Sequence, residues 1–266
     1  MTAEREPEVL AIRYGTVQTT RSAVFHDYGQ YGEPDAAAQM DYFFWLIRGQ
    51  ECGTVLVDTG FDPRVGSRRG RTCLVDPVAA LAGLGVAAAD VEHVVVTHLH
   101  YDHVGNLAAF PAATVTVAAA ELEFWSGSGP AETGCLGLAE PAEIEGLKDA
   151  VRQGRVRSIG HATSELPGLE IRLVGGHTPG QLVVSVPTAG GRVVLASDAV
   201  HFAEEMRRDR PHQLVVDMAA MRAAYAWLRE EEQAGALVVA GHDPAVTSQF
   251  ETVAELGGGS ALRLAS

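Results

Sequence analysis

Four side chains that could bind a metal lie within six residues, in the segment His98-Leu-His100-Tyr-Asp102-His103. Imidazole and carboxylate groups together are ligands for a borderline divalent metal such as zinc. The segment follows Val94-Val95-Val96, a β-branched run typical of a buried strand. A loop at the end of a central strand would present all four side chains together. A polar loop that merely contains several histidines is the alternative, and the H-x-H-x-D-H spacing disfavours it.

Three more residues of ligand type come directly after strand-like runs. They are His177, Asp198 and His242, which follow the runs 171–174, 193–196 and 237–240. The glycines, prolines and serine around them predict turns. One such residue alone would more often belong to a turn than bind an ion. Three of them, together with the first segment, favour a metal site built from several loops.

Apolar runs and turn signals predict the elements that must position these residues. The expected strands are Val9–Tyr14, Tyr42–Gly49, Thr54–Val57, Val91–Thr97, Thr114–Val117, Ile171–Val174, Leu182–Val186, Val193–Ala196 and Leu237–Ala240. The expected helices are Val78–Leu84, Val104–Phe110, Ala118–Trp125 and Met218–Glu232. Asp76 and Asp217 are N-caps for the first and last of them. On the last helix, Met221, Tyr225 and Leu228 share one face and are expected in the core.

The pattern predicts an α+β fold with two sheets packed face to face and helices outside. No Pro/Ser-rich linker divides the 266 residues, and the candidate ligands run from His98 to His242, so we expect a single domain over residues 1–266. Ser126–Gly137 is rich in glycine and serine and predicts a loop beside the substrate pocket. The first few residues and the tail 257–266 are expected to be poorly ordered.

Charge and composition restrict the partners. The net charge of −14 counts against a groove for nucleic-acid phosphates. The one basic stretch, Arg64–Arg71, predicts a solvated loop. No run approaches the roughly 18 to 20 apolar residues of a membrane span. The charged N-terminus lacks the apolar core of a signal peptide, and the three cysteines are scattered, so we expect a cytoplasmic protein with free thiols.

The order HxHxDH, His, Asp, His resembles the two-zinc members of the metallo-β-lactamase superfamily, over about Met40 to Phe250. Within it, the chain is most similar to the N-acyl-homoserine lactonases and related enzymes such as the pyridoxolactone-opening lactonases. The resemblance implies a four-layer αβ/βα sandwich. It also implies two zinc ions, with iron, manganese or cobalt as alternatives. Related lactonases include dimers, so a homodimer is one expected assembly.

The resemblance assigns the metal ligands residue by residue. The first metal would take His98, His100 and His177, the second would take Asp102, His103 and His242, and Asp198 would bridge the two. A hydroxide shared by the metals would attack the carbonyl of a lactone or ester substrate. By the same resemblance, Asp102 would also protonate the leaving alkoxide. Asp58, in Asp58-Thr59-Gly60, would orient a ligand histidine, although it could equally cap a turn.

One position departs from the family. Many homoserine-lactone hydrolases carry a tyrosine three residues after the bridging Asp, where its hydroxyl contacts the lactone carbonyl. Here His201 takes that position. Its imidazole could donate the same hydrogen bond, or it could be a structural histidine. The change weakens the prediction that acyl-homoserine lactones are the substrates. It does not weaken the prediction that the enzyme opens a lactone ring.

Several alternatives share the ligand pattern. Thioester hydrolases resembling glyoxalase II carry a helical extension after the last ligand, whereas only 24 residues follow His242. A β-lactamase would normally be exported. A flavo-di-iron protein needs an attached flavodoxin-like domain, and a non-enzymatic binding module would usually have lost ligands. Opening of a non-quorum lactone, such as an aromatic one, remains an alternative of the same class.

The remaining histidines and the large apolar side chains carry less information. Packing or surface roles are expected for His26, His93, His161 and His212. Candidates for the substrate pocket are Tyr28, Tyr31, Met40, Phe44, Phe124, Trp125 and Phe202, each of which could instead be core or surface.

Overall fold

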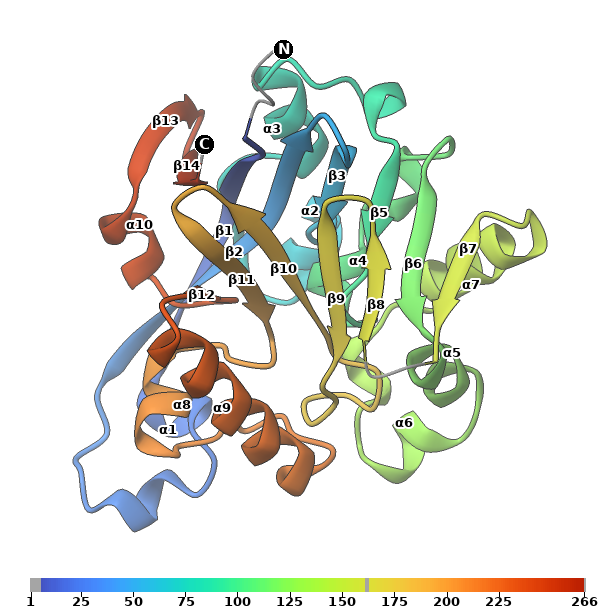
Figure 1. Cartoon of the computed structure of the whole chain (residues 1–266). Helices are drawn as coiled ribbons and strands as arrows, with labels where there is room; N and C mark the ends of the chain where they lie inside the picture. Colours follow the sequence, from blue (N-terminus) through green and yellow to red (C-terminus); the bar gives the residue numbers. More distant parts are fainter. Residues whose placement is uncertain (1–5, 161–162, 266) are drawn as a thin grey trace.

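A computed structural model describes residues 6–160 and 163–265 of the chain. Within these residues the strands form a nine-stranded sheet and a five-stranded sheet (Figure 1). His161 lies outside the described residues, as do residues 1–5. In the part of the chain described, no helix has the length and apolar character needed to cross a bilayer.

The nine-stranded sheet is built mainly from the first half of the chain and closed by its last two strands. Its order is β13 (Glu251–Leu256), β14 (Gly259–Ala265), β1 (Glu8–Thr20), β2 (Ala37–Gly49), β3 (Gly53–Val57), β5 (His93–Val95), β6 (Thr114–Ala118) and β7 (Val156–Ile159), with β4 (Thr72–Cys73) pairing with β1. The five-stranded sheet has the order β12 (Leu237–Ala240), β11 (Gly191–Ser197), β10 (Leu182–Thr188), β9 (Leu169–Leu173) and β8 (Thr163–Leu166).

Ten α-helices accompany the sheets in the described residues. They are α1 (Arg21–Val24), α2 (Pro63–Arg68), α3 (Pro77–Gly83), α4 (Tyr101–Val104), α5 (Ala119–Ser126), α6 (Gly129–Glu132), α7 (Pro141–Arg152), α8 (Ala203–Arg208), α9 (Met218–Gln233) and α10 (Ala245–Gln249). The predicted caps are present, because the Asp76 and Asp217 carboxylates accept backbone N–H groups at the starts of α3 and α9.

Three buried clusters define four layers. On β1, Val9 and Ala11 face the second sheet, whereas Leu10 and Ile12 face the helices α3, α4 and α7. This follows from the alternation of side chains along a strand. The second sheet packs in turn against α8 and α9, where Met221, Tyr225 and Leu228 are fully buried, as predicted. The predicted four-layer αβ/βα sandwich is confirmed.

The prediction of a poorly ordered tail is wrong for residues up to 265. Residues 259–265 form β14, which is paired on both sides, with β1 and with β13. Ala261 and Leu262 are fully buried, one in each of the two large clusters. The glycine run Gly257-Gly258-Gly259 makes the turn of a hairpin instead of starting a loose end. The apolar residues that follow it therefore contribute to the core.

The prediction that Ser126–Gly137 is loop throughout is also wrong, because it contains α6 and the start of a 3₁₀ turn, Leu136–Leu138. Other elements were missed entirely, chiefly α7, β7 and β13. The first strand extends to Thr20, six residues beyond its predicted end at Tyr14. These differences lie away from the runs that precede the candidate ligands, which do form strands.

The directions of the strands bring the candidate ligands to one edge of the sandwich. β3 runs parallel to β5, and β11 runs parallel to β12. β9 has the same direction as β11, because both are antiparallel to β10. The carboxyl ends of these strands therefore meet, and each is followed by one of the loops that carry Asp58, His98, His177, Asp198 and His242.

Candidate metal centre

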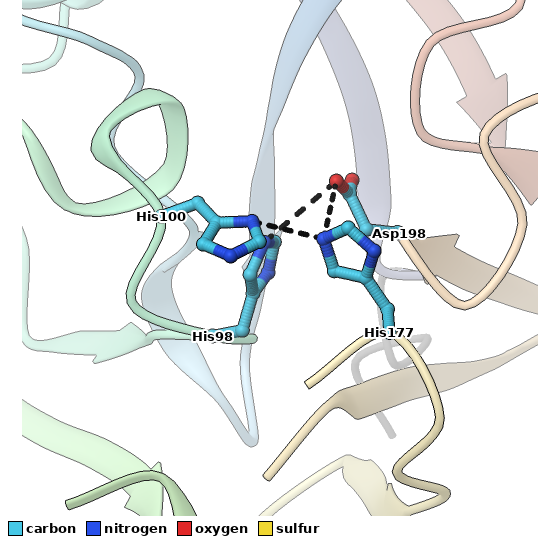
Figure 2. Close-up of side chains that lie close together, drawn as sticks. All are labelled: His98, His100, His177 and Asp198. Carbon is cyan, nitrogen blue, oxygen red and sulfur yellow. Dashed lines mark hydrogen bonds and ion pairs between the residues drawn. The ribbon is translucent and has the colours of Figure 1, made fainter. Parts of the chain in front are cut away.

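Four buried side chains converge from loops of both sheets in the first of two groups (Figure 2). Nδ1 of His100 lies 3.0 Å from Nε2 of His98 and 2.9 Å from Nε2 of His177. Oδ2 of Asp198 lies 3.7 Å and 3.3 Å from the same two Nε2 atoms. Tetrahedral zinc with bonds of about 2.0 to 2.1 Å keeps its ligand atoms roughly 3.3 Å apart. The spacing of these atoms fits such an ion.

A second group adjoins the first. It consists of Asp102, His103 and His242, all buried. Nε2 of His103 and Nε2 of His242 lie 3.3 Å and 3.1 Å from Oδ1 of Asp198. The Asp102 carboxylate lies 3.9 Å from each of these imidazoles. The two groups contain all seven predicted ligands, and the carboxylate of Asp198, a member of the first group, also lies next to the second.

Asp198 divides its two oxygens between the groups. Oδ2 faces His98 and His177, whereas Oδ1 faces His103 and His242. Among the described residues, neither Oδ1 of Asp198 nor Nε2 of His103 has a hydrogen-bond partner, although both are buried. Buried polar atoms normally have partners, since desolvation without one is costly. Orphaned ligand-type atoms that face each other fit a divalent cation on the Oδ1 side of Asp198.

Hydrogen bonds on the far side of the rings fix the orientation of three histidines. Their Nδ1 atoms contact the Asp58 carboxylate for His103 (2.8 Å), the Asp41 carbonyl for His242 (2.8 Å) and the Leu214 carbonyl for His177 (2.9 Å). A partner that accepts from Nδ1–H leaves the Nε2 lone pair free to face an ion. These contacts therefore prepare the three Nε2 atoms as ligands.

Asp58 makes the contact that the resemblance implied. Its Oδ2 accepts from both His103 and the Thr97 hydroxyl, and its Oδ1 accepts from the Thr97 backbone N–H at 2.8 Å. Its φ of 64° is left-handed, a conformation that a non-glycine residue adopts at a cost. The strained corner after β3 thus directs the carboxylate beneath the metal loop, and Asp58 does more than cap a turn.

Glu121 is a buried carboxylate that sequence reasoning missed. Its Oε1 accepts the Leu99 backbone N–H at 2.9 Å and the indole N–H of Trp125 at 2.8 Å. Its Oε2 accepts the Gly180 N–H at 3.0 Å. Leu99 separates two candidate ligands, and Gly180 ends the loop of His177. One side chain at the start of α5 therefore holds loops from both sheets. No sequence motif identifies Glu121, because the backbone groups that it binds lie far away in the sequence.

His201 and His212 both join the site. Their rings stack at 3.6 Å with an interplanar angle of 14°. Nε2 of His201 lies 3.1 Å from Oδ2 of Asp198, and its Nδ1 lies 3.5 Å from Glu205. Together with His177, these histidines form a third group able to hold an ion. The prediction of a packing or surface role for His212 is incomplete, because its buried ring also lines the cavity at the centre.

Burial and mutual repulsion keep several of these imidazoles neutral. Burial, with the neighbouring imidazoles of His103 and His100, holds the pKa of His98 well below its usual range. Burial and the imidazoles of His201 and His177 do the same to the pKa of His212. Burial lowers the pKa of His177 to about 3. Neutral rings keep the lone pairs that a cation needs.

The carboxylates produce the opposite shift at two positions. Burial alone would lower the pKa of His103, but Asp198, Asp58 and Asp102 raise it well above the usual value. Burial would likewise lower the pKa of His201, but Asp198 and Glu205 raise it to about 10. The negative charge around Asp198 attracts a positive charge, which a proton or a metal ion can supply.

A cavity of about 340 Å³ opens onto both groups. Its lining includes six buried residues of ligand type, namely His100, Asp102, Asp198, His201, His212 and His242. The lining also includes the apolar residues Val17, Met40, Leu138 and Leu214, together with Tyr42, Arg71 and Tyr101. Of the candidates for the pocket, Met40 lines this cavity and Phe44 is in the core, whereas Tyr28 and Phe202 belong to a small cluster against which Met40 also packs. The volume suits a small molecule.

Comparisons with known proteins agree with this geometry. A human protein named metallo-beta-lactamase domain-containing protein 1 is 34% identical over 200 residues, which cover 72% of this chain and 59% of that protein. An N-acyl homoserine lactonase, AttM, of Azorhizobium caulinodans is 27% identical over 188 residues, covering 65% of this chain and 66% of the lactonase. This chain thus spans about three fifths to two thirds of the length of these two relatives.

Solved structures show the same fold. A quorum-quenching N-acyl homoserine lactone lactonase superposes with a TM-score of 0.75 at 20% identity, covering 92% of this chain and 95% of that structure. The family model of the metallo-beta-lactamase superfamily matches residues 41–242, a range that begins at Asp41 and ends at the last candidate ligand, His242. The chain therefore belongs to the metallo-beta-lactamase superfamily.

Proposed function

We propose that this protein is a metal-dependent hydrolase that opens a lactone ring, with an activity like that of the N-acyl-homoserine lactonases. The observation that carries the proposal is Asp198, whose two oxygens face two separate groups of histidines. His98, His100 and His177 would hold one zinc ion, and Asp102, His103 and His242 the other. Lactonases among the relatives and the structural neighbours support the substrate class.

The chain's own residues position the substrate and move the proton. When bound, two divalent ions supply a nucleophile from water at neutral pH and polarise a carbonyl. Asp102 lines the cavity, where its carboxyl group can carry a proton to the leaving alkoxide. His201 lines the same cavity, and its imidazole can donate a hydrogen bond to the carbonyl oxygen. The apolar walls hold the rest of the substrate.

Four further expectations belong to this proposal. Zinc is the expected metal, with iron, manganese or cobalt as alternatives that elemental analysis of the purified protein would distinguish. A homodimer and a cytoplasmic location follow from the resemblance and the composition, together with a small-molecule substrate in place of nucleic acid or membrane. Light scattering at several protein concentrations would test the dimer.

Proton release at neutral pH by the zinc-loaded protein tests the proposal directly. The panel contains acyl-homoserine lactones, aromatic lactones, a β-lactam and a thioester. Asp102→Asn should lower lactone turnover by about 10²-fold or more, the usual range for a lost general acid or base. If only the thioester or the β-lactam reacts, the lactonase assignment fails. If Asp102→Asn keeps full turnover with both metals bound, the proton-transfer role of Asp102 is wrong.

A further inference from the structure

One arginine in the wall of the cavity lacks a carboxylate partner. The stretch Arg64–Arg71 holds four arginines. Three of them form ion pairs, Arg64 with Asp62 at 3.8 Å and Arg68 and Arg69 with Glu140 at 3.0 Å and 2.6 Å. No carboxylate of the described residues lies within ion-pairing distance of Arg71, which is half-buried. The prediction of a merely solvated stretch therefore does not describe Arg71.

The guanidinium of Arg71 is held in place by neutral groups. Its Nε donates to the Tyr101 hydroxyl at 3.0 Å, and its Nη1 donates to the Arg69 carbonyl at 2.8 Å. Tyr101 is itself packed beneath the Arg69 guanidinium at 4.2 Å. Among the described residues, Nη2 of Arg71 has no hydrogen-bond partner. The side chain is thus oriented, with part of its donor capacity unused.

Arg71 lies where a substrate would meet it. It lines the same cavity as Asp102, Asp198 and His242, together with Tyr42 and Tyr101. It is the one lysine or arginine among the described residues that line this cavity. Tyr42 lines the cavity together with Arg71, and its ring lies 5.0 Å from the ring of His242 between centroids. Arg71 and the metal centre therefore border the same cavity. A ligand that fills the cavity would contact both.

The positive charge of Arg71 decides which class of ligand this part of the cavity favours. A half-buried guanidinium with no carboxylate at ion-pairing distance can form an ion pair with a carboxylate that a ligand brings. The guanidinium fork matches a carboxylate, and charge-assisted bonds of this kind are strong. A single cation suits a singly charged acid better than a phosphate dianion. The net charge of −14 would otherwise repel anions, so attraction has to be local.

We propose that Arg71 binds an ionised carboxylate carried by the substrate, so that lactones with an acidic side group are preferred over neutral ones. The inference rests on the proposed lactonase function and narrows its substrate class. It also sets this protein apart from an enzyme for acyl-homoserine lactones with plain alkyl chains, which carry no charge for Arg71 to bind.

A matched series of lactones tests the inference on the zinc-loaded protein. N-succinyl-, N-glutaryl- and N-adipoyl-homoserine lactone place a carboxylate at increasing distance from one ring, and their terminal carboxamides are neutral controls of the same size. We expect the best-placed carboxylate to exceed its carboxamide by about 10- to 100-fold in kcat/KM, the range for one charge-assisted hydrogen bond. The difference should lie mainly in KM.

Variants of Arg71 and Arg64 separate the loss of the contact with the substrate carboxylate from a general loss of folding. Arg71→Gln should reduce the preference to near unity, and Arg71→Lys should keep part of it. Arg64→Gln, in the same stretch but with a side chain 90% exposed, should keep the wild-type preference. The preference is the ratio of kcat/KM for the carboxylate to kcat/KM for its carboxamide, taken within each variant. A partial loss of folding lowers both values equally and cancels from the ratio.

Two failures can be told apart. If lactones are opened but carboxylates and carboxamides react equally, or Arg71→Gln keeps the preference, the inference about Arg71 is overturned and the lactonase function stands. If no lactone is opened, the proposed function fails. Calorimetric binding of the ring-opened compounds then decides the role of Arg71. Tighter binding of the carboxylate that Arg71→Gln abolishes would support it, and equal affinities would overturn it.

Discussion

At the scale of single residues, Glu121 connects the two halves of the metal centre. It accepts backbone N–H groups from Leu99 and Gly180, which belong to loops of different sheets. In Glu121→Gln, an amide NH₂ replaces one accepting oxygen and faces an N–H donor. We expect about 1 to 3 kcal/mol of lost stability and roughly 10- to 100-fold weaker zinc binding. Thermal unfolding and competition with a zinc-binding dye would measure the two effects.

The control for this prediction is Glu123→Gln, an exposed residue of the same helix. That variant should match the wild type in both measurements, since surface substitutions usually change stability by less than about 0.5 kcal/mol. Equal zinc affinity in Glu121→Gln and Glu123→Gln would show that Glu121 does not position the ligand loops.

His201 is the second residue whose role is testable alone. Its ring is buried between Asp198, Glu205 and the stacked ring of His212. If it donates a hydrogen bond to the substrate carbonyl, His201→Phe should lower kcat by roughly 10²-fold, as for one lost oxyanion donor. His201→Tyr should retain more of the activity, because a hydroxyl is restored. Steady-state kinetics on variants with verified zinc content would measure this, and unchanged kcat in His201→Phe would leave a structural role only.

At the scale of elements, a buried carboxyl group at the start of α7 makes the stability of the folded protein depend on pH. Oε2 of Glu143 accepts the Glu140 N–H at 3.2 Å, whereas Oε1 is buried without a partner among the described residues. Burial raises the pKa of Glu143 from 4.5 to about 8. Between these values the folded state keeps a proton that the unfolded state has lost. Stability therefore falls as the pH rises from 4.5 to 8.

Glu143→Gln removes this titration while keeping an acceptor for the Glu140 N–H. The variant should unfold at a higher temperature than the wild type at a pH above 8, and the difference should shrink towards pH 4.5. Calorimetric unfolding across this range would measure it. Glu145→Gln, exposed on the same helix, should not change the slope. A wild-type slope in Glu143→Gln would show that Glu143 is ionised in the folded protein.

Elements also differ in how well short-range patterns predict them. The strands before the candidate ligands were predicted, because compact apolar runs end at turn-forming residues and both signals are local. β14 was not predicted, because its glycine-rich start resembles a loose tail. Only its pairing with β1 and β13 makes it part of the core. α7 was missed although Pro141 stands at its first position, where proline favours a helix start.

At the scale of the whole molecule, the metal centre joins the two sheets. The first segment of ligands follows β5 of one sheet, whereas His177, Asp198 and His242 follow strands of the other. Removing the ions would leave buried imidazoles and carboxylates without a counter-charge. With free zinc about 100-fold above Kd, each site should contribute about 2.7 kcal/mol. Chelation should then lower Tm by roughly 5 to 10 °C for each site emptied.

Scanning calorimetry before and after treatment with a chelator would measure this shift, and added zinc should reverse it. Elemental analysis has to show that the ions were removed. An unchanged Tm in protein shown to be metal-free would contradict a centre that connects the sheets, while leaving the fold untouched.

The sequence by itself determined the family, the fold class and the identity of the candidate ligands. The candidate ligands follow from their residue types and their place after apolar runs, which are local properties, whereas the family and the αβ/βα sandwich come from the resemblance that the ligand order carries. The structure brings all seven candidates together, and their roles as ligands remain a proposal. A contact between Asp58 and a ligand histidine was expected from the resemblance alone, and the structure identifies that histidine as His103, 45 residues away.

Only the tertiary structure decided how the site is completed. The division of the Asp198 oxygens, the stacking of His212 on His201 and the two loops held by Glu121 depend on residues far apart in the chain. The same holds for Arg71, where the missing carboxylate partner distinguishes it from the three paired arginines nearby. The sequence shows which residues can be ionised, but the neighbours that neutralise them, or fail to, are set by packing in three dimensions.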